Sequence, residues 1–380
     1  MSVVRRDAQR RWATVAAAVT VACLLPVIVS SFSSGGTRSD PTRLRDLILA
    51  SAGRPFQGYI AVQGELGLPD VPNVGELPSL LGGSTNLRVW YSSPSAWRVA
   101  ELTATGETDT YRTADSTYVW DFESNLLTRS VGEGLRLPRS ADLLPPALAR
   151  RLLQYSTGTD QLTAIAGRRV AGVAASGLRW TTSDPDTTIG RIDVWADPGT
   201  GLAVRVEVAG RASGTALTAQ FQDLEQTPPA AELLMPSRPE SAGYTETRAE
   251  NVISAINVLA ALPLPKTLAG RTRRSAPSGA PDVVGLGAYG EGLSMFAVAA
   301  VPGRLATQTL QKLREGGAVP VVVGNGSGEA YEVHTSLVNA LIVRSPGPGR
   351  RRTYLLAGST SAEVLRQAGT ELLSPTPARQ

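Results

Sequence analysis

Short runs of alternating apolar and polar residues between Leu87 and Arg129 place the strongest constraint on how this chain can fold. The runs are separated by Pro, Ser, Asp and Asn, which favour turns. Alternation with a period of two is typical of antiparallel strands that bury one face. Three of the six tryptophans, Trp90, Trp97 and Trp120, fall in this stretch. Its buried face therefore needs an apolar cover, either helices of the chain or a bound ligand. The sequence therefore predicts four strands here, at residues 87–91, 98–103, 109–113 and 117–122.

A second set of alternating runs follows further along the chain, beyond a separate strand expected at residues 56–66. Within this set, Val204 and Val206 oppose Arg205 and Glu207, so one face of the second sheet region is apolar. These runs predict strands at residues 177–182, 189–197, 202–209 and 215–224.

Only two short helices are expected close to this long sheet, at residues 41–53 and 143–155. Asp40 or Ser39 can cap the first helix, and Pro41 suits its first position. Two short helices cannot easily cover the concave side of so long a sheet, so we hypothesise a residual apolar cavity. The faces are assigned from the alternation of apolar and polar residues. A slip of one residue in the register would move every one of these side chains to the opposite face. The side chains expected to point inward and line the cavity are Leu87, Val89, Tyr91, Trp120, Ile192, Val194, Val204, Val206, Leu217 and Phe221.

The N-terminus carries an export signal. Four arginines between Arg5 and Arg11 precede an apolar run at residues 13–32, which at about 20 residues is long enough to cross a bilayer. Positive charge before such a run keeps the N-terminus in the cytoplasm and exports the rest of the chain. Three fates of the run stay open: retention as a single-pass anchor, cleavage near residues 30–34 with secretion of the rest, or lipidation at Cys23.

Pro-rich and Gly-rich stretches divide the exported chain into parts. Residues 282–373 alternate strands with two helices, at 304–315 and 361–373, and predict a small α+β domain. The expected parts are residues 1–38 (basic segment, apolar run and tether), 39–240 (large β domain), 241–281 (a helix at 247–262 and a basic linker), 282–373 (small domain) and 374–380 (flexible tail).

The residue types needed for catalysis or metal binding are scarce. Cys23 is the only cysteine and His334 the only histidine, so no intramolecular disulfide and no Cys/His metal cage can form. His334 lies in a strand-like run, and the aspartates fall at strand ends and turns, where they form local hydrogen bonds. The net charge is only +4 and the arginines are scattered, which argues against nucleic-acid binding. We expect a binding protein, with no enzymatic activity and no cofactor.

Six short motifs occur in an order and spacing that resemble a known superfamily. They are Phe56-Gln57-Gly58, residues 87–98 (LRVWYSSPSAWR), 114–121 (ADSTYVWD), 192–205 (IDVWADPGTGLAVR), 218–223 (TAQFQD) and 288–298 (AYGEGLSMFAV). Together they resemble the exported proteins of the LolA lipoprotein-carrier and RseB/MucB sigma-factor-regulator superfamily, over residues 54–380. The last motif is similar to a strand entry in the second domain of the RseB/MucB type, which simple LolA carriers lack.

The resemblance implies a mainly β (α+β) fold. An N-terminal membrane helix would be followed by a curved, antiparallel, unclosed half-barrel around helices, and then by a small α+β domain. It also implies a cavity for the acyl chains of a lipid or lipoprotein, and a membrane partner such as an anti-sigma factor. One position departs from the carriers, because Ser93 stands where they place an arginine before the proline of the motif.

Three functions remain open. The first is an exported, membrane-tethered, lipid- or lipoprotein-binding regulator of the RseB/MucB type, at the cell membrane with most of the chain extracytoplasmic. The second is a LolA-like lipoprotein or lipid carrier, which Ser93 disfavours. The third is a structural partner of a membrane complex whose core is filled and holds no ligand.

Overall fold

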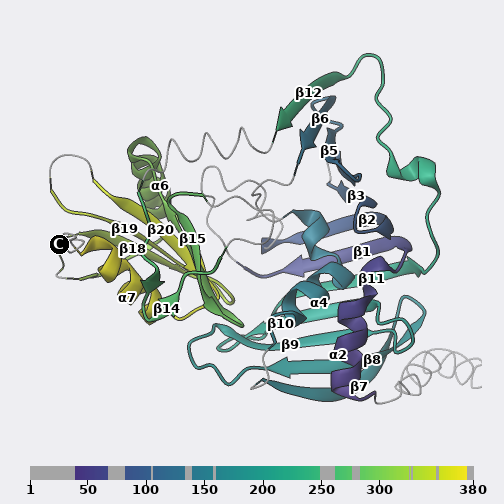
Figure 1. Cartoon of the computed structure of the whole chain (residues 1–380), viewed down its shortest axis with the longest axis horizontal. Helices are drawn as coiled ribbons and strands as arrows, with labels where there is room; N and C mark the ends of the chain where they lie inside the picture. The colour runs from purple at the N-terminus through teal and green to yellow at the C-terminus, as the bar shows by residue number, and fades with distance from the viewer. Residues whose placement is uncertain are drawn as a thin grey trace, which may run out of the picture.

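Figure 1 shows the computed structural model of the chain. The described residues are 39–66, 82–103, 106–132, 139–156, 160–248, 262–275, 283–324, 326, 328–347 and 351–374. The apolar run at residues 13–32, Cys23 and most of the helix predicted at 247–262 lie outside them. Within the described stretches, every helix is too short or too polar to cross a bilayer.

A large sheet of 12 strands dominates the structure, and it is unclosed because β12 and β7 form its two edges. Its strand order is β12-β6-β5-β4-β3-β2-β1-β11-β10-β9-β8-β7. The predicted strands are all present, and only their ends differ from the expected positions. The strands are β1 (Phe56–Gly64), β2 (Ser84–Ser93), β3 (Ala96–Leu102), β4 (Glu107–Arg112), β5 (Ser116–Asp121), β6 (Leu126–Val131), β7 (Gln161–Val170), β8 (Val173–Thr181), β9 (Ile189–Ala196), β10 (Ala203–Gly210), β11 (Thr215–Glu225) and β12 (Gly243–Arg248).

One edge of the sheet departs from the expected antiparallel order. β12 pairs in parallel with β6, and Gly243 lies opposite Leu126. The chain between β11 and β12, residues 226–242, has to reach the far edge of the sheet, since β11 lies beside β1 and β12 lies beside β6. The large sheet therefore extends past residue 240, where the sequence predicted the end of the first domain. We call residues 226–242 the strap.

Two short helices pack on one face of the sheet, across the β7–β11 half (Figure 1). They are α2 (Pro41–Ala50) and α4 (Pro145–Leu153). The Asp40 carboxylate accepts a hydrogen bond from the Arg43 backbone N–H at 2.8 Å and caps α2, as predicted. A 3₁₀ turn, η1 (Ser51–Gly53), follows α2. We call the face that α2 and α4 cover the inner face, and the opposite one the outer face.

The C-terminal part is a second sheet with a helix on each face. Leu341 and Val343 of one strand pack in the core cluster of α7, while Ile342 between them packs in that of α6. Adjacent residues of a strand point to opposite faces, so the two helices cover opposite sides. The strands are β15 (Leu286–Glu291), β16 (Ser294–Ala300), β17 (Val319–Pro320), β18 (Glu329–His334), β19 (Asn339–Arg344) and β20 (Thr353–Gly358), and the helices are α6 (Gly303–Glu315) and α7 (Ala362–Leu373).

Part of the predicted basic linker is folded. Thr267–Leu268 and Arg271–Thr272 pair as the short hairpin β13–β14, and Leu268 is buried in the core of the small domain. Arg271 Nη2 lies 2.8 Å from Asp186 Oδ2, on the loop before β9. On the same loop, the Thr187 hydroxyl donates to the Leu293 carbonyl at 2.9 Å, so polar contacts connect the two sheets.

Candidate functional site

Nine of the ten residues predicted to line a cavity lie together on the inner face. Val206 pairs with Val194 on one side and Ala219 on the other, and Leu87 pairs with Ile60. Residues that pair directly across antiparallel strands share a face. All nine are buried in one apolar cluster that includes residues of α2 and α4. They are Leu87, Val89, Tyr91, Ile192, Val194, Val204, Val206, Leu217 and Phe221.

Trp120 is the exception, and its predicted orientation is wrong. It pairs with Asp109 of β4 and Leu127 of β6, and it packs in a separate small cluster with Tyr111 and Ala242. Register explains the difference, since the inward row that starts at Val89 continues through Val99, Thr110 and Val119. The residue next to Val119 must therefore point to the outer face.

Aromatic rings close one end of the inner face. Phe56 stacks on Tyr91 with ring centroids 4.8 Å apart and meets Phe221 edge-on at 5.6 Å. The Tyr91 hydroxyl donates to the Ala52 carbonyl at 2.7 Å, and the Arg150 guanidinium donates to the Ser51 hydroxyl at 3.3 Å. Burial raises the pKa of Tyr91 and lowers that of Arg150. The apolar face therefore ends in a polar rim formed by η1, α4 and β2.

The outer face carries a row of arginine and aromatic side chains that sequence reasoning missed. Pairing aligns Gln57, Trp90, Arg98, Tyr111 and Tyr118 across five neighbouring strands. The Arg98 guanidinium lies 4.4 Å from the centre of the Trp90 ring and 5.2 Å from that of Tyr111. Each arginine and each ring is visible in the sequence, but only the register between strands shows that they form one row.

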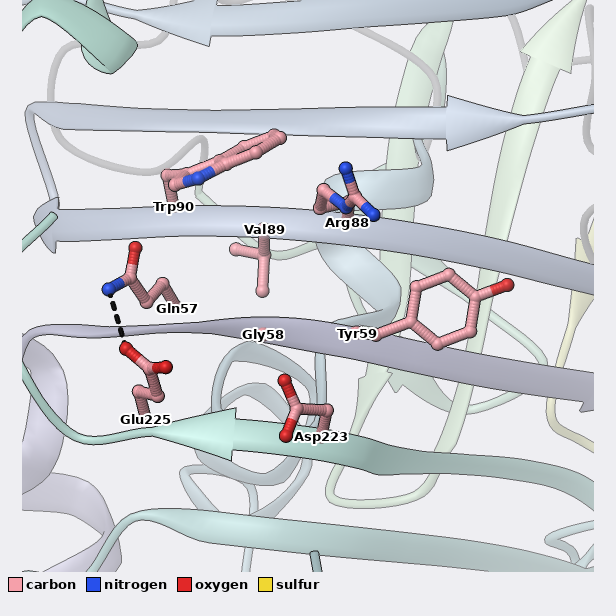
Figure 2. Close-up of a pocket in the computed structure, with 8 residues that line it drawn as sticks. All are labelled: Gln57, Gly58, Tyr59, Arg88, Val89, Trp90, Asp223 and Glu225. Carbon is pink, nitrogen blue, oxygen red and sulfur yellow. Dashed lines mark hydrogen bonds between the residues drawn. The ribbon is translucent and has the colours of Figure 1, made fainter.

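One pocket of about 330 Å³ opens on the outer face across β11, β1 and β2 (Figure 2). At one end the Gln57 amide donates to the Glu225 carboxylate at 2.9 Å. A Cβ at Gly58 would lie 2.2 Å from the Asp223 carbonyl oxygen, so only glycine allows β1 and β11 to approach this closely. We call it the Tyr59 pocket; its lining residues are Gln57, Gly58, Tyr59, Arg88, Val89, Trp90, Asp223 and Glu225.

A second pocket, of about 270 Å³, lies between the outer face and the strap. The sheet contributes aromatic side chains and the strap mainly apolar ones. Of the large apolar side chains that are strongly exposed, three line this pocket: Phe122, Leu233 and Met235. We call it the Trp120 pocket; its lining residues are Arg98, Tyr111, Trp120, Phe122, Glu232, Leu233, Met235, Ser237 and Pro239.

A buried carboxylate supports the sheet side of the Trp120 pocket. Asp109 is fully buried, and its Oδ2 accepts hydrogen bonds from Arg98 Nη2 at 2.7 Å and from the Tyr111 hydroxyl at 3.0 Å. Burial and the Asp109 charge raise the pKa of Tyr111, so this phenol stays protonated. Burial and the same charge also raise the pKa of Glu107, which lies 3.5 Å from Arg98.

The described residues contain no group of three or more His, Cys, Asp or Glu side chains placed to hold a metal ion. His334 lies on β18, as its strand-like run predicted, with its Nε2 3.1 Å from Glu332 Oε2 and its Nδ1 3.1 Å from Asn339 Oδ1. Glu332 is also bound by Arg366 at 2.6 Å. These contacts tie β18 to β19 and α7.

No family model matches the chain, and neither does any curated protein. Among solved structures, MucB in complex with MucA(peri) is 14% identical, with a TM-score of 0.48 over 87% of this chain and 97% of that one. The Pseudomonas aeruginosa MucA/MucB complex is 17% identical, with a TM-score of 0.48 over 87% and 96%. A LolA superfamily protein from Nitrosomonas europaea is 11% identical, with a TM-score of 0.24 over 50% and 97%. Structures of both branches named from the sequence motifs are thus similar to this chain, and the likeness says nothing about what the chain binds.

Proposed function

We propose that this chain is an exported, membrane-tethered regulator that holds acyl chains of a lipid or lipoprotein against the inner face. The observation that supports this is the convergence of nine apolar side chains from β2, β9, β10 and β11 beneath two short helices. Each methylene that an acyl chain buries on such a surface contributes about 0.8 kcal/mol.

Few hydrogen bonds hold the two helices to the sheet. Just before α2, the Ser39 hydroxyl donates to the Ser176 hydroxyl on β8 at 3.0 Å. Within η1, the Ala52 carbonyl accepts a hydrogen bond from the Tyr91 hydroxyl. Arg150 of α4 binds Ser51 of η1, which ties the helical segments to each other. Among the described residues, the remaining contacts between these helices and the sheet are apolar packing, which an acyl chain can replace without leaving a buried polar group unpaired. An acyl chain would therefore enter by displacing α4 or α2.

The position of Ser93 favours a regulator over a carrier. Ser93 ends β2, and its hydroxyl lies 3.3 Å from that of Ser95. A neutral hydroxyl cannot form the strong paired hydrogen bonds that an arginine gives to an anionic headgroup. By analogy with the MucB complex, the proposed partner is a membrane protein such as an anti-sigma factor, with the apolar run at residues 13–32 as the tether.

A structural partner with a filled core is the second candidate, and one observation favours it. All nine inner-face side chains are at most 7% exposed without any ligand. The two helices and the sheet can thus bury each other's apolar surface fully, as in an ordinary protein core.

An acyl-chain titration of the chain from Ser39 onward separates these functions. A fluorescent C16 fatty acid should bind saturably, and Val206→Phe should weaken binding roughly tenfold because it overfills the inner face. Gln63→Phe adds the same ring at an exposed position on the outer side of β1 and should leave binding unchanged. Absence of saturable binding would select the structural partner. Transfer of the bound fatty acid to an acceptor protein would select the carrier.

A further inference from the structure

Arginines of the chain accompany most aromatic rings on the outer face of β2–β6 and β12. A guanidinium within about 6 Å of a ring centre is attracted by the π electrons. Besides Trp90 and Tyr111, two further rings have such a partner: Arg129 lies 5.8 Å from Tyr118, and Arg238 lies 5.3 Å from Tyr244.

The rings of Trp120 and Phe122 differ from this pattern. They meet edge-on at 5.3 Å, and among the described residues no arginine lies over either of them. Phe122 is 49% exposed, and both rings line the Trp120 pocket. The pocket therefore presents two rings, those of Trp120 and Phe122, over which no arginine of the described stretches lies.

The charges around the Trp120 pocket favour a positive group. Glu232 lines the pocket from the strap, and it has neither a hydrogen bond nor an ion pair in the described part of the chain. The positive charge of Arg98, the arginine in the lining, is already neutralised by Asp109 at 2.7 Å and Glu107 at 3.5 Å. A carboxylate beside aromatic rings is the arrangement that attracts an organic cation.

We propose that the Trp120 pocket binds the guanidinium group of an arginine side chain on a partner polypeptide. Arginine suits the pocket better than lysine because its planar, weakly hydrated head stacks on rings and can pair with Glu232 at the same time. Its aliphatic stem would lie against Leu233 and Met235, which are exposed at the rim. The pocket is on the opposite face of the sheet from the proposed acyl-chain site, so the two proposals stand or fall separately.

The test uses the full chain labelled with 5-fluorotryptophan, with the ¹⁹F resonance of Trp120 assigned from its loss in Trp120→Phe. N-acetyl-arginine amide should shift this resonance saturably, whereas the neutral isostere N-acetyl-citrulline amide should not. Glu232→Gln should weaken the arginine probe about threefold to fivefold, the range of an exposed ion pair. Phe122→Leu keeps apolar bulk and should weaken the probe about twofold to fivefold through the lost cation–π attraction.

Glu240→Gln is the matched control, since Glu240 is exposed on the same strap but does not line the pocket. It removes the same charge and should leave the affinity unchanged. Equal binding of the citrulline and arginine probes would overturn the proposal, and so would equal losses in Glu232→Gln and Glu240→Gln. If choline chloride shifts the Trp120 resonance at a lower concentration than the arginine probe, the proposal would also be overturned, in favour of a quaternary ammonium ligand.

Discussion

Truncating Phe221 tests whether the inner face is a ligand site as well as a core. The ring is 1% exposed and meets Phe56 edge-on at 5.6 Å. Removing a buried phenyl group costs the transfer free energy of its atoms plus a cavity term, about 3–5 kcal/mol in total. The contact with Phe56 accounts for about 0.5–1.5 kcal/mol of that loss. We therefore expect Phe221→Ala to lower the free energy of unfolding of the large domain by about 3–5 kcal/mol.

Tryptophan fluorescence during urea unfolding reports this loss of stability in the large domain. The tryptophans after the N-terminal segment are Trp90, Trp97, Trp120, Trp180 and Trp195, which all belong to the large sheet, and the small domain has none. Adding a C16 fatty acid at about 100 times its Kd should return about 2.7 kcal/mol to the variant, since a ligand of the folded state stabilises it by mass action.

Phe296→Ala is the matched control in the small domain. Phe296 is also 1% exposed, and it stacks on Tyr289 at 5.4 Å. Circular dichroism should show a loss of stability of about 3–5 kcal/mol for this variant, and the fatty acid should return none of it. A loss below about 1 kcal/mol in Phe221→Ala would refute the packing argument. No recovery of Phe221→Ala with fatty acid would refute the acyl-chain site.

Three further predictions concern the framework of the site. Burial alone would raise the pKa of Asp197, but hydrogen bonds to its carboxylate lower it, so the ionised carboxylate stabilises the folded state at pH values above its ordinary pKa. Asp197→Asn should therefore lower the free energy of unfolding by about 0.5–1 kcal/mol at pH 7, measured by urea unfolding. This loss should fade as the pH drops below about 4. Arg98→Met should cost about 3–5 kcal/mol because it leaves the buried Asp109 carboxylate without its nearest cation, and a smaller loss in the double variant Arg98→Met/Asp109→Leu would identify that charge as the cause. Gly201→Ala should lower the thermal midpoint, since Gly201 has a φ of +73° and a Cβ there would lie 2.2 Å from the Leu47 carbonyl; an unchanged midpoint would contradict the close approach of α2 to the β9–β10 turn.

Local features of the sequence predicted most strands of the large sheet, but not its edge pair β6 and β12. Alternation predicted strands at 189–197 and 202–209, which form the β9–β10 hairpin, and Asp40 and Pro41 predicted the start of α2. These signals act within a few residues, where backbone propensity and side-chain hydrogen bonds decide the structure.

Pairings between distant segments could not be predicted in this way. β12 lies parallel to β6, and Arg129 of β6 meets Glu246 of β12 at 3.3 Å although 117 residues separate them. Alternation shows that Trp120 and Val119 point to opposite faces, but it does not show which face joins the core. The strap decides this, because Ala242 covers the small cluster around Trp120 on the outer side.

In β2, a residue of the proposed acyl-chain site is followed by one that contacts the lining of the Trp120 pocket on the opposite face. Val89 packs in the inner core, while Trp90 lies on the outer face beneath Arg98, which also lines the Trp120 pocket. If binding of an acyl chain at the inner face also shifts β2, Trp90 would move and Arg98 with it, because consecutive residues of a strand share one rigid backbone. Any such coupling is reciprocal: if bound fatty acid changes the affinity for the arginine probe by some factor, the probe must change the affinity for fatty acid by the same factor. Measuring both affinities with and without the other ligand therefore tests whether β2 links the faces, and unequal factors would mean that the two probes do not bind the same folded chain.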